Sequence, residues 1–231
     1  MRFRNTILAS LTAGALVLSG CGQVVPAAHA AEKVVLAPKP ARTAKEGAGL
    51  KTAVFAGGCF WGVEAVFSHV DGVTSAVSGY HGGTKRQANY ELVSGGMTDH
   101  AEAVKVTYDP RKVSYDELVR IFFSVVADPT LLNRQGPDRG TQYRTALIPM
   151  NAEQNAVAKS YLSQMGKSGK WNGSIKATIE RAQAFYPAES YHQDFAHKNP
   201  NHGYIKRWDA PKVTALKRLF PQHYRAAFRT G

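Results

Sequence analysis

The chain has 231 residues, of which 29 are lysine or arginine and 17 are aspartate or glutamate, so its formal net charge is +12 with histidine neutral. A nucleic-acid-binding function would require basic residues clustered with stacking aromatics on one face. The basic residues are instead scattered along the sequence, and a basic, soluble surface with some attraction to anionic membranes accounts for the charge without a nucleic-acid partner.

The first twenty residues have the pattern of an export signal. Arg2 and Arg4 precede an uncharged apolar stretch over 6–20, which is too short to span a membrane. This stretch ends in Leu-Ser-Gly-Cys at 18–21, which resembles the lipobox of bacterial lipoproteins and makes Cys21 the predicted lipidation site. Ala-His-Ala at 28–30 fits ordinary signal cleavage and is the alternative. We therefore expect a protein of the cell envelope, either periplasmic or anchored to a membrane.

The composition after the signal predicts three further segments. Residues 21–49 are rich in Ala, Pro, Lys and Gly without apolar periodicity, which indicates a flexible tether. The remaining chain is long enough to bury the core of one compact domain. We assign a catalytic domain to residues 50–208 and a basic C-terminal extension to residues 209–231.

Apolar periodicity in the first half of this domain predicts strands and helices in mixed order. A buried strand is expected over 51–56, a helix over 60–70, and alternating strands over 73–80 and 102–108. The glycine-rich polar segment 82–96 is too long for an ordinary connection, which indicates a functional loop. Ser114 and Glu117 have the spacing of a capping box at the start of the next helix.

The second half continues the same mixture. A polar loop over 128–142 precedes a strand over 143–150, and a helix capped by Asn151 is expected to end at Gly166. Further expected elements are a strand at 174–182, a short helix or loop at 189–198, and an amphipathic helix at 213–228 interrupted at Pro221. Strand and helix do not alternate strictly, so we predict an α+β domain with helices packed on a mixed sheet.

Cys59 lies between the first strand and the first helix, directly after Gly57 and Gly58. Amide groups at the start of a helix favour a thiolate, so we expect the pKa of Cys59 to fall. If Cys21 carries a lipid, Cys59 has no partner cysteine in its own chain, and it is either buried and inert or a reactive thiol. Phe60 and Trp61 follow it, as core anchors or as walls of an apolar pocket.

Three polar segments could serve this thiol. Glu102 stands at the start of a predicted strand, where apolar surroundings would raise the pKa of its carboxyl and let it donate a proton near neutrality. The other two segments are residues 138–144, which begin with Asp138, and residues 186–193. Each segment alone is a weak signal, because loops are generally polar.

Four motifs, in this order, resemble those of the A-type peptide methionine sulfoxide reductases. They are Gly-Cys-Phe-Trp-Gly at 58–62, His-Ala-Glu-Ala-Val at 100–104, Arg-Gly-Thr-Gln-Tyr-Arg at 139–144 and Ala-Glu-Ser-Tyr-His-Gln at 188–193. The resemblance runs from about Thr52 to Asn199. It implies a two-layer α+β domain that reduces the S epimer of methionine sulfoxide, free or in oxidised proteins.

The resemblance also implies a role for individual residues. Cys59 would attack the sulfoxide sulfur and become a sulfenic acid, while Glu102 would donate a proton to the sulfoxide oxygen. The remaining implied roles are binding of that oxygen by Tyr90 and Tyr143, organisation of the site by Asp138, and a pocket for the substrate methyl group formed by Phe60 and Trp61.

The chain departs from the family pattern in having no cysteine after Tyr204, where many relatives carry one or two resolving cysteines. We therefore expect an external thiol to reduce oxidised Cys59, either a thioredoxin-like protein or dithiothreitol in vitro. No bound cofactor and no metal are expected, and we expect a monomer.

Three rival functions stay open on the sequence alone. A cysteine peptidase would need a histidine base, for which His81, His100 and His192 are available. A metal site at His192, His197 and His202 is disfavoured, because a five-residue step turns a helix by about 140° and separates the side chains. A non-catalytic binding lipoprotein is supported only by the basic charge.

Overall fold

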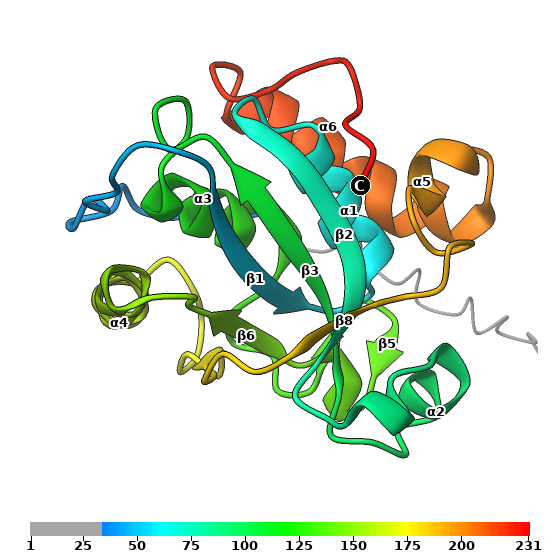
Figure 1. The fold of residues 1–231 in the computed structure, drawn as a ribbon. Helices are drawn as coiled ribbons and strands as arrows, with labels where there is room; N and C mark the ends of the chain where they lie inside the picture. The colour runs from blue at the N-terminus through cyan, green and yellow to red at the C-terminus, as the bar shows by residue number, and fades with distance from the viewer. Residues whose placement is uncertain (1–33) are drawn as a thin grey trace, which may run out of the picture. The chain divides into compact units, whose positions relative to one another are not determined.

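A mixed sheet of six strands forms the centre of the computed structural model, which describes residues 34–231 (Figure 1). The strand order is β7-β6-β1-β3-β2-β8, in which β6 and β7 are parallel and the other neighbours are antiparallel. The strands are β1 (Lys51–Gly57), β2 (Val73–His81), β3 (Ala101–Tyr108), β6 (Thr145–Ile148), β7 (Thr178–Ile179) and β8 (Phe185–Pro187). Two further short strands, β4 (Arg134–Gln135) and β5 (Asp138–Arg139), pair with each other.

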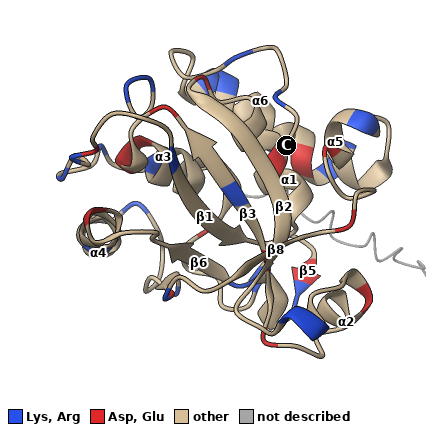
Figure 2. Cartoon of the chain, in the orientation of Figure 1, with Lys and Arg blue, Asp and Glu red and all other residues tan. Residues whose placement is uncertain are grey.

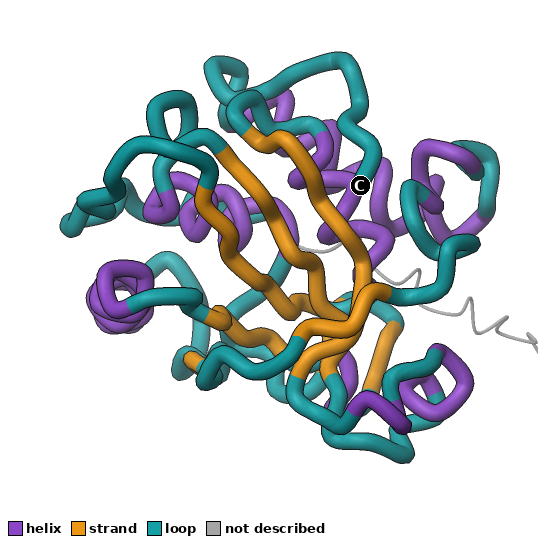
Figure 3. The backbone as a smooth tube through the Cα atoms, viewed as in Figure 1, coloured by secondary structure: helices purple, strands orange, loops and turns teal. Residues whose placement is uncertain are grey.

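Helices and single helical turns surround this sheet (Figure 3). The α-helices are α1 (Phe60–Ser68), α2 (Tyr90–Ser94), α3 (Tyr115–Ile121), α4 (Ala152–Lys167), α5 (Phe195–Lys198) and α6 (Ala210–Leu219). The other helical segments are η1 (Lys85–Gln87), η2 (Phe122–Val126), η3 (Thr141–Tyr143) and η4 (Ile205–Asp209). The predicted class, α+β with helices packed on a mixed sheet, is confirmed. No helix within residues 34–231 combines the length and the apolar character needed to cross a membrane.

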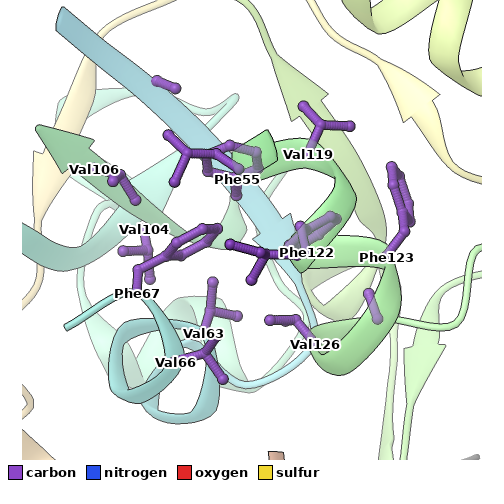
Figure 4. Close-up of a cluster of buried hydrophobic side chains, with 14 of the residues drawn as sticks. Phe55, Val63, Val66, Phe67, Val104, Val106, Val119, Phe122, Phe123 and Val126 are labelled. Atoms are coloured by element: carbon purple, nitrogen blue, oxygen red, sulfur yellow. The ribbon is translucent and has the colours of Figure 1, made fainter. Parts of the chain in front are cut away.

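The main core lies between one face of the sheet and the helical segments α1, α3 and η2 (Figure 4). Successive side chains of β1 point to opposite faces, as strand geometry requires. Phe55 therefore packs in the main core, whereas Val54 belongs to a smaller cluster on the other face. Val63 and Phe67 of α1 join the main core. This packing fixes α1 against the sheet, and with it the residue just before its first turn.

Of the two helix caps predicted from the sequence, one is present in the structure and the other is not. The Asn151 side chain accepts a hydrogen bond of 2.9 Å from the Gln154 backbone N–H, so the predicted cap of α4 is confirmed. The capping box predicted at Ser114 is wrong, because the Ser114 side chain makes no capping hydrogen bond. Glu46 Oε2 accepts from the Tyr115 N–H at 3.0 Å instead. A side chain distant in sequence has taken the place of the local cap.

Residues 34–49 differ from the flexible tether expected there. Ala37 is 1 % exposed, and its N–H donates to Ser124 Oγ at 3.0 Å. Glu46 Oε1 accepts a hydrogen bond of 2.5 Å from the Tyr108 hydroxyl. This segment has no regular structure, so apolar periodicity could not reveal that it packs. The predicted signal, the lipidation site Cys21 and the alternative cleavage site at 28–30 lie outside the described residues.

Residues 209–231 also differ from the extension expected there, since they pack into the domain. Leu216 and Phe220 are completely buried, and the Asp71 N–H donates to the His223 carbonyl at 2.7 Å. The helix α6 begins before the predicted start at residue 213 and ends before Pro221. Lys and Arg residues are spread over several elements rather than gathered on one (Figure 2).

Candidate active site

Cys59 occupies the junction between β1 and α1, where it is the N-cap residue of α1 and 9 % exposed. The turn into this position requires Gly58, whose φ of +82° lies in the left-handed region. A Cβ on Gly58 would lie 2.6 Å from Cβ of Gln135, so a larger residue would also collide with its neighbour. The glycine before the cysteine is therefore fixed by both conformation and space.

The expected fall in the pKa of Cys59 is wrong. Burial raises the pKa of the thiol well above its usual value, and the negative charges of Glu102 and Asp209 raise it further. A backbone hydrogen bond from Trp61 lowers the pKa, as a helix start should, but it does not outweigh burial. The thiol is accordingly protonated at neutral pH.

Glu102 lies beside the Cys59 turn because of the strand register. Phe55 of β1 pairs with Val104 of β3, and two residues further along the two strands are Gly57 and Glu102. The carboxyl of Glu102 is 1 % exposed, and its Oε2 accepts a hydrogen bond of 2.9 Å from the Phe60 N–H. Burial is the main cause that raises the pKa of Glu102 to about 8. The raised pKa expected from the sequence is confirmed, so this carboxyl is protonated at neutral pH.

Tyr90 is the first residue of α2, the helix inside the glycine-rich segment. Its N–H donates to Glu189 Oε1 at 2.9 Å, and Glu189 Oε2 accepts a 2.7 Å hydrogen bond from Tyr80. Burial, followed by the charge of Glu102 and then of Cys59, raises the pKa of Tyr90 to about 12. Glu189, from the fourth motif, therefore holds the predicted oxygen-binding loop against β2.

Tyr143 ends η3 and has an environment similar to that of Tyr90. Burial raises the pKa of its phenol, and the charges of Glu102 and Asp138 raise it further. Both phenols stay protonated at neutral pH and are hydrogen-bond donors. The structure thus brings Cys59, Glu102, Tyr90 and Tyr143, which come from four separate parts of the sequence, into one electrostatic environment.

Asp138 has a partner that sequence reasoning missed. The Tyr204 hydroxyl donates a short hydrogen bond to Asp138 Oδ2. Asp138 in turn raises the pKa of both Cys59 and Glu102 by charge repulsion. Asp209 was also missed, because a lone aspartate in a basic segment carries no signal, yet it is completely buried and acts on the same two groups.

Phe60 and Trp61 are placed differently from each other. Phe60 is completely buried, and its ring lies 5.9 Å from that of Tyr80. Trp61 is only half-buried and stacks on Phe195, with ring centroids 3.8 Å apart and planes 9° apart. Its indole N–H donates a 3.1 Å hydrogen bond to His192 Nδ1. Phe60 is thus part of the core under the site, whereas Trp61 forms an aromatic wall at its edge.

The histidines do not support the rival sites. A peptidase base would bind the cysteine thiol, but His81 Nε2 accepts from the Gln183 N–H and His100 Nδ1 from the Gly83 N–H. His192 accepts from Trp61. Within residues 34–231, no three His, Cys, Asp or Glu side chains are grouped so that they could hold a metal ion. The arrangement favours a thiol and a neutral carboxylic acid as the reacting pair.

Comparisons with known proteins identify the family of the chain. The family model described as peptide methionine sulfoxide reductase matches residues 51–224. The peptide methionine sulfoxide reductase MsrA 2 of Mesorhizobium japonicum is 53% identical over 180 residues, covering 78% of this chain and 92% of the relative. MsrA 2 of Synechocystis is 44% identical over 217 residues, covering 94% of this chain and 98% of the relative.

Solved structures give the same result. The reduced form of Mxr1 from Saccharomyces cerevisiae superposes with a TM-score of 0.56 at 30% identity, covering 76% of this chain and 91% of that one. Methionine sulfoxide reductase A of Corynebacterium diphtheriae has the same TM-score at 32% identity, covering 67% and 77%. The chain belongs to the peptide methionine sulfoxide reductase family and is an oxidoreductase of the MsrA type.

Proposed function

We propose that this enzyme reduces the S epimer of methionine sulfoxide, free or in oxidised proteins, with Cys59 as nucleophile and Glu102 as proton donor. One observation carries the proposal. Glu102 is a buried carboxyl with a pKa of about 8, and it is hydrogen-bonded to the backbone N–H of the residue next to Cys59. A neutral acid beside a thiol is what protonation of a sulfoxide oxygen requires.

The reaction transfers one oxygen atom. The Cys59 sulfur attacks the sulfoxide sulfur while Glu102 gives its proton to the sulfoxide oxygen, which turns that oxygen into a better leaving group. The attack forms an S–S bond between Cys59 and the substrate. This S–S bond and the S–O bond of the substrate then break as the protonated oxygen moves to the Cys59 sulfur and forms a new S–O bond there. The proton of the Cys59 thiol passes to Glu102 and restores its neutral carboxyl. The net change converts a thiol and a sulfoxide into a sulfenic acid and methionine, so Cys59 is oxidised by two electrons and the substrate is reduced by two.

The two phenols and the aromatic pair orient the substrate. Tyr90 and Tyr143 have raised pKa values, so both can donate hydrogen bonds to the oxygen as negative charge develops on it. Trp61, with Phe60 beneath the site, bounds the space for the methyl group. Asp138, held by Tyr204, organises the phenol side of the site.

An external thiol completes the cycle. The chain has two cysteines, Cys21 and Cys59, and none follows Tyr204. The sulfenic acid on Cys59 condenses with one external thiol, releasing water and leaving a mixed disulfide, and a second thiol then releases the reduced enzyme. A thioredoxin-like protein supplies both thiols in the cell, and dithiothreitol replaces it in vitro. Mass spectrometry after one turnover without reductant should find the sulfenic acid on Cys59, whereas a disulfide to Cys21 would exclude this route.

The same enzyme acts in the cell envelope as a monomer that repairs oxidised envelope proteins. The export pattern at 1–20 and the tetrad ending in Cys21 support this part of the proposal. Fractionation of cells making the full chain, with Cys21→Ser beside it, tests the anchor. The wild type should enter the membrane fraction and Cys21→Ser the soluble fraction, whereas equal distribution would favour cleavage after Ala30.

The decisive assay uses the separated S and R epimers of methionine sulfoxide with dithiothreitol as reductant. The enzyme should consume only the S epimer, and Cys59→Ser should consume neither. Consumption of the R epimer alone would refute the proposal. The matched control Ser124→Cys places a thiol elsewhere in the core and should not restore activity to Cys59→Ser.

A further inference from the structure

A buried ion pair that the proposed reaction does not use lies against the first turn of α1. Asp209, at the end of η4, is completely buried, and Lys212, in the first turn of α6, is 6 % exposed. The Lys212 ammonium lies 3.8 Å from Asp209 Oδ1. Removing two charges from water costs free energy that their mutual attraction repays only in part, so a buried pair gives weak grounds for a purely stabilising role.

Gly62 shows where this pair lies relative to the cysteine. A Cβ on Gly62 would be 2.2 Å from Asp209 Oδ1 and 3.3 Å from Lys212 Nζ. Both charges therefore touch α1 at Gly62, three residues after Cys59, and only glycine leaves room for them. Residues three apart at a helix start are neighbours on the same side of the helix. In Figure 1, α6 lies alongside α1, and both α6 and η4 contact α1.

Within residues 34–231, the charged side chains that raise the pKa of Cys59 are all carboxylic acids. Glu102 faces it from β3, Asp138 from β5 and Asp209 from η4. Three phenols face it as well, from Tyr90, Tyr143 and Tyr204. Above about pH 8, where Glu102 also ionises, carboxylates on three sides oppose a thiolate. Lys212 is a buried cation that pairs with Asp209 beside the same helix turn.

We infer that Asp209 and Lys212 are positioning residues that hold opposite charges beside Cys59 and so set the reactivity of its thiol. The Asp209 carboxylate adds to the effect of burial on the thiol, and the Lys212 ammonium limits that addition so that Cys59 can still react. The inference rests on the proposed role of Cys59 as nucleophile. It also gives a role to the segment after Tyr204, which in this chain holds a charge pair and no resolving cysteine.

Alkylation of Cys59 by iodoacetamide tests the inference without any sulfoxide. The rate is measured from pH 7 to 10 on the full chain, with Cys59 followed by peptide mass spectrometry. Asp209→Asn should shift the alkylation profile to lower pH by about one unit. Below the midpoint of the profile, this shift makes alkylation of Cys59 about tenfold faster. Lys212→Met should shift it to higher pH by a similar amount. The double variant should return to the wild-type profile.

Opposite shifts of the two alkylation profiles distinguish an electrostatic effect from structural damage, because damage would shift the profiles of both single variants in the same direction. The matched controls are Asp71→Asn and Lys112→Met, an exposed pair 4.0 Å apart that makes the same changes in net charge. Shifts in one direction, or shifts no larger than those of the controls, would overturn the inference. If one single variant does not fold, the other single variant and the double variant still test the inference. A double variant whose alkylation profile stays shifted like that of the single variant would contradict it. A failure of sulfoxide reduction would leave the alkylation result unchanged.

Discussion

The indole N–H of Trp61 donates a 3.1 Å hydrogen bond to Nδ1 of His192, which ties the aromatic wall of the site to the fourth motif. His192 is 2 % exposed, and burial lowers its pKa, so the ring is neutral at neutral pH and Nδ1 can accept. The same ring packs against Tyr90, with centroids 4.2 Å apart. One histidine thus contacts both Trp61 of the proposed methyl pocket and Tyr90 of the proposed oxygen-binding pair.

Replacing His192 by Phe should loosen Trp61 while keeping a ring in the same space. We expect the KM for free methionine S-sulfoxide to rise about fivefold, because this factor corresponds to the net free energy of one ordinary hydrogen bond. The value of kcat should change less than twofold. Steady-state kinetics with dithiothreitol measure both constants. His202→Phe is the matched control, since His202 meets Trp61 only edge-on. A fall in kcat at constant KM would show that His192 acts on the chemical step instead.

The pKa of about 8 at Glu102 predicts the pH dependence of turnover. An acid must be protonated to act, so kcat/KM should fall as the pH rises above about 8. In Glu102→Gln we expect kcat/KM to drop at least about a hundredfold at pH 7. The remaining rate should rise with pH, because only the Cys59 thiol then titrates. A variant that keeps the decline above pH 8 would assign that decline to another group.

Tyr204 should contribute to turnover through its hydrogen bond to Asp138. Tyr204→Phe removes one charge-assisted bond, and we expect kcat/KM to fall about tenfold. Tyr191→Phe is a suitable control because Tyr191 is 60% exposed. Equal activities of the two variants would show that Asp138 keeps its place without Tyr204.

Glu64 on α1 makes stability depend on pH. Burial raises its pKa from 4.5 to about 8, although Oε2 accepts a 2.9 Å hydrogen bond from the Asp194 N–H. Between these pH values the folded protein binds more protons than the unfolded chain, so this group lowers the free energy of unfolding as the pH rises. Glu64→Gln keeps the acceptor and should gain at least about 1 kcal/mol relative to wild type between pH 5 and 8.

Urea unfolding at the two pH values measures this difference. Glu91→Gln, on the exposed side of α2, is the control and should show no such gain. If Glu64→Gln loses stability equally at both pH values, then its carboxylate is ionised in the folded protein and compensated there.

Strand and helix periodicity predicted the elements around the cysteine well, because these elements bury regular apolar faces. The strand at 51–56 and the helix at 60–70 correspond to β1 and α1. The expected strand over 174–182 is reduced to the two residues of β7, because the N–H groups of Lys176 and Ala177 donate to the Pro129 carbonyl instead of to a strand. Residues 34–49 pack without periodicity, and their contacts with α3 and α4 come from single side chains.

The sequence by itself determined the family and the fold class, because the four motifs carry their residues in short runs with fixed spacing. It also supplied the proposed nucleophile, Cys59, and the proposed acid, Glu102. Only the tertiary structure decided how these groups titrate. At Cys59, burial raises the pKa by more than the backbone hydrogen bond at the helix start lowers it. This burial depends on chain segments far from residue 59. The partners Tyr204, Asp209 and His192 reach the site from the last part of the domain, which the chain brings against α1 and β2 only when it folds.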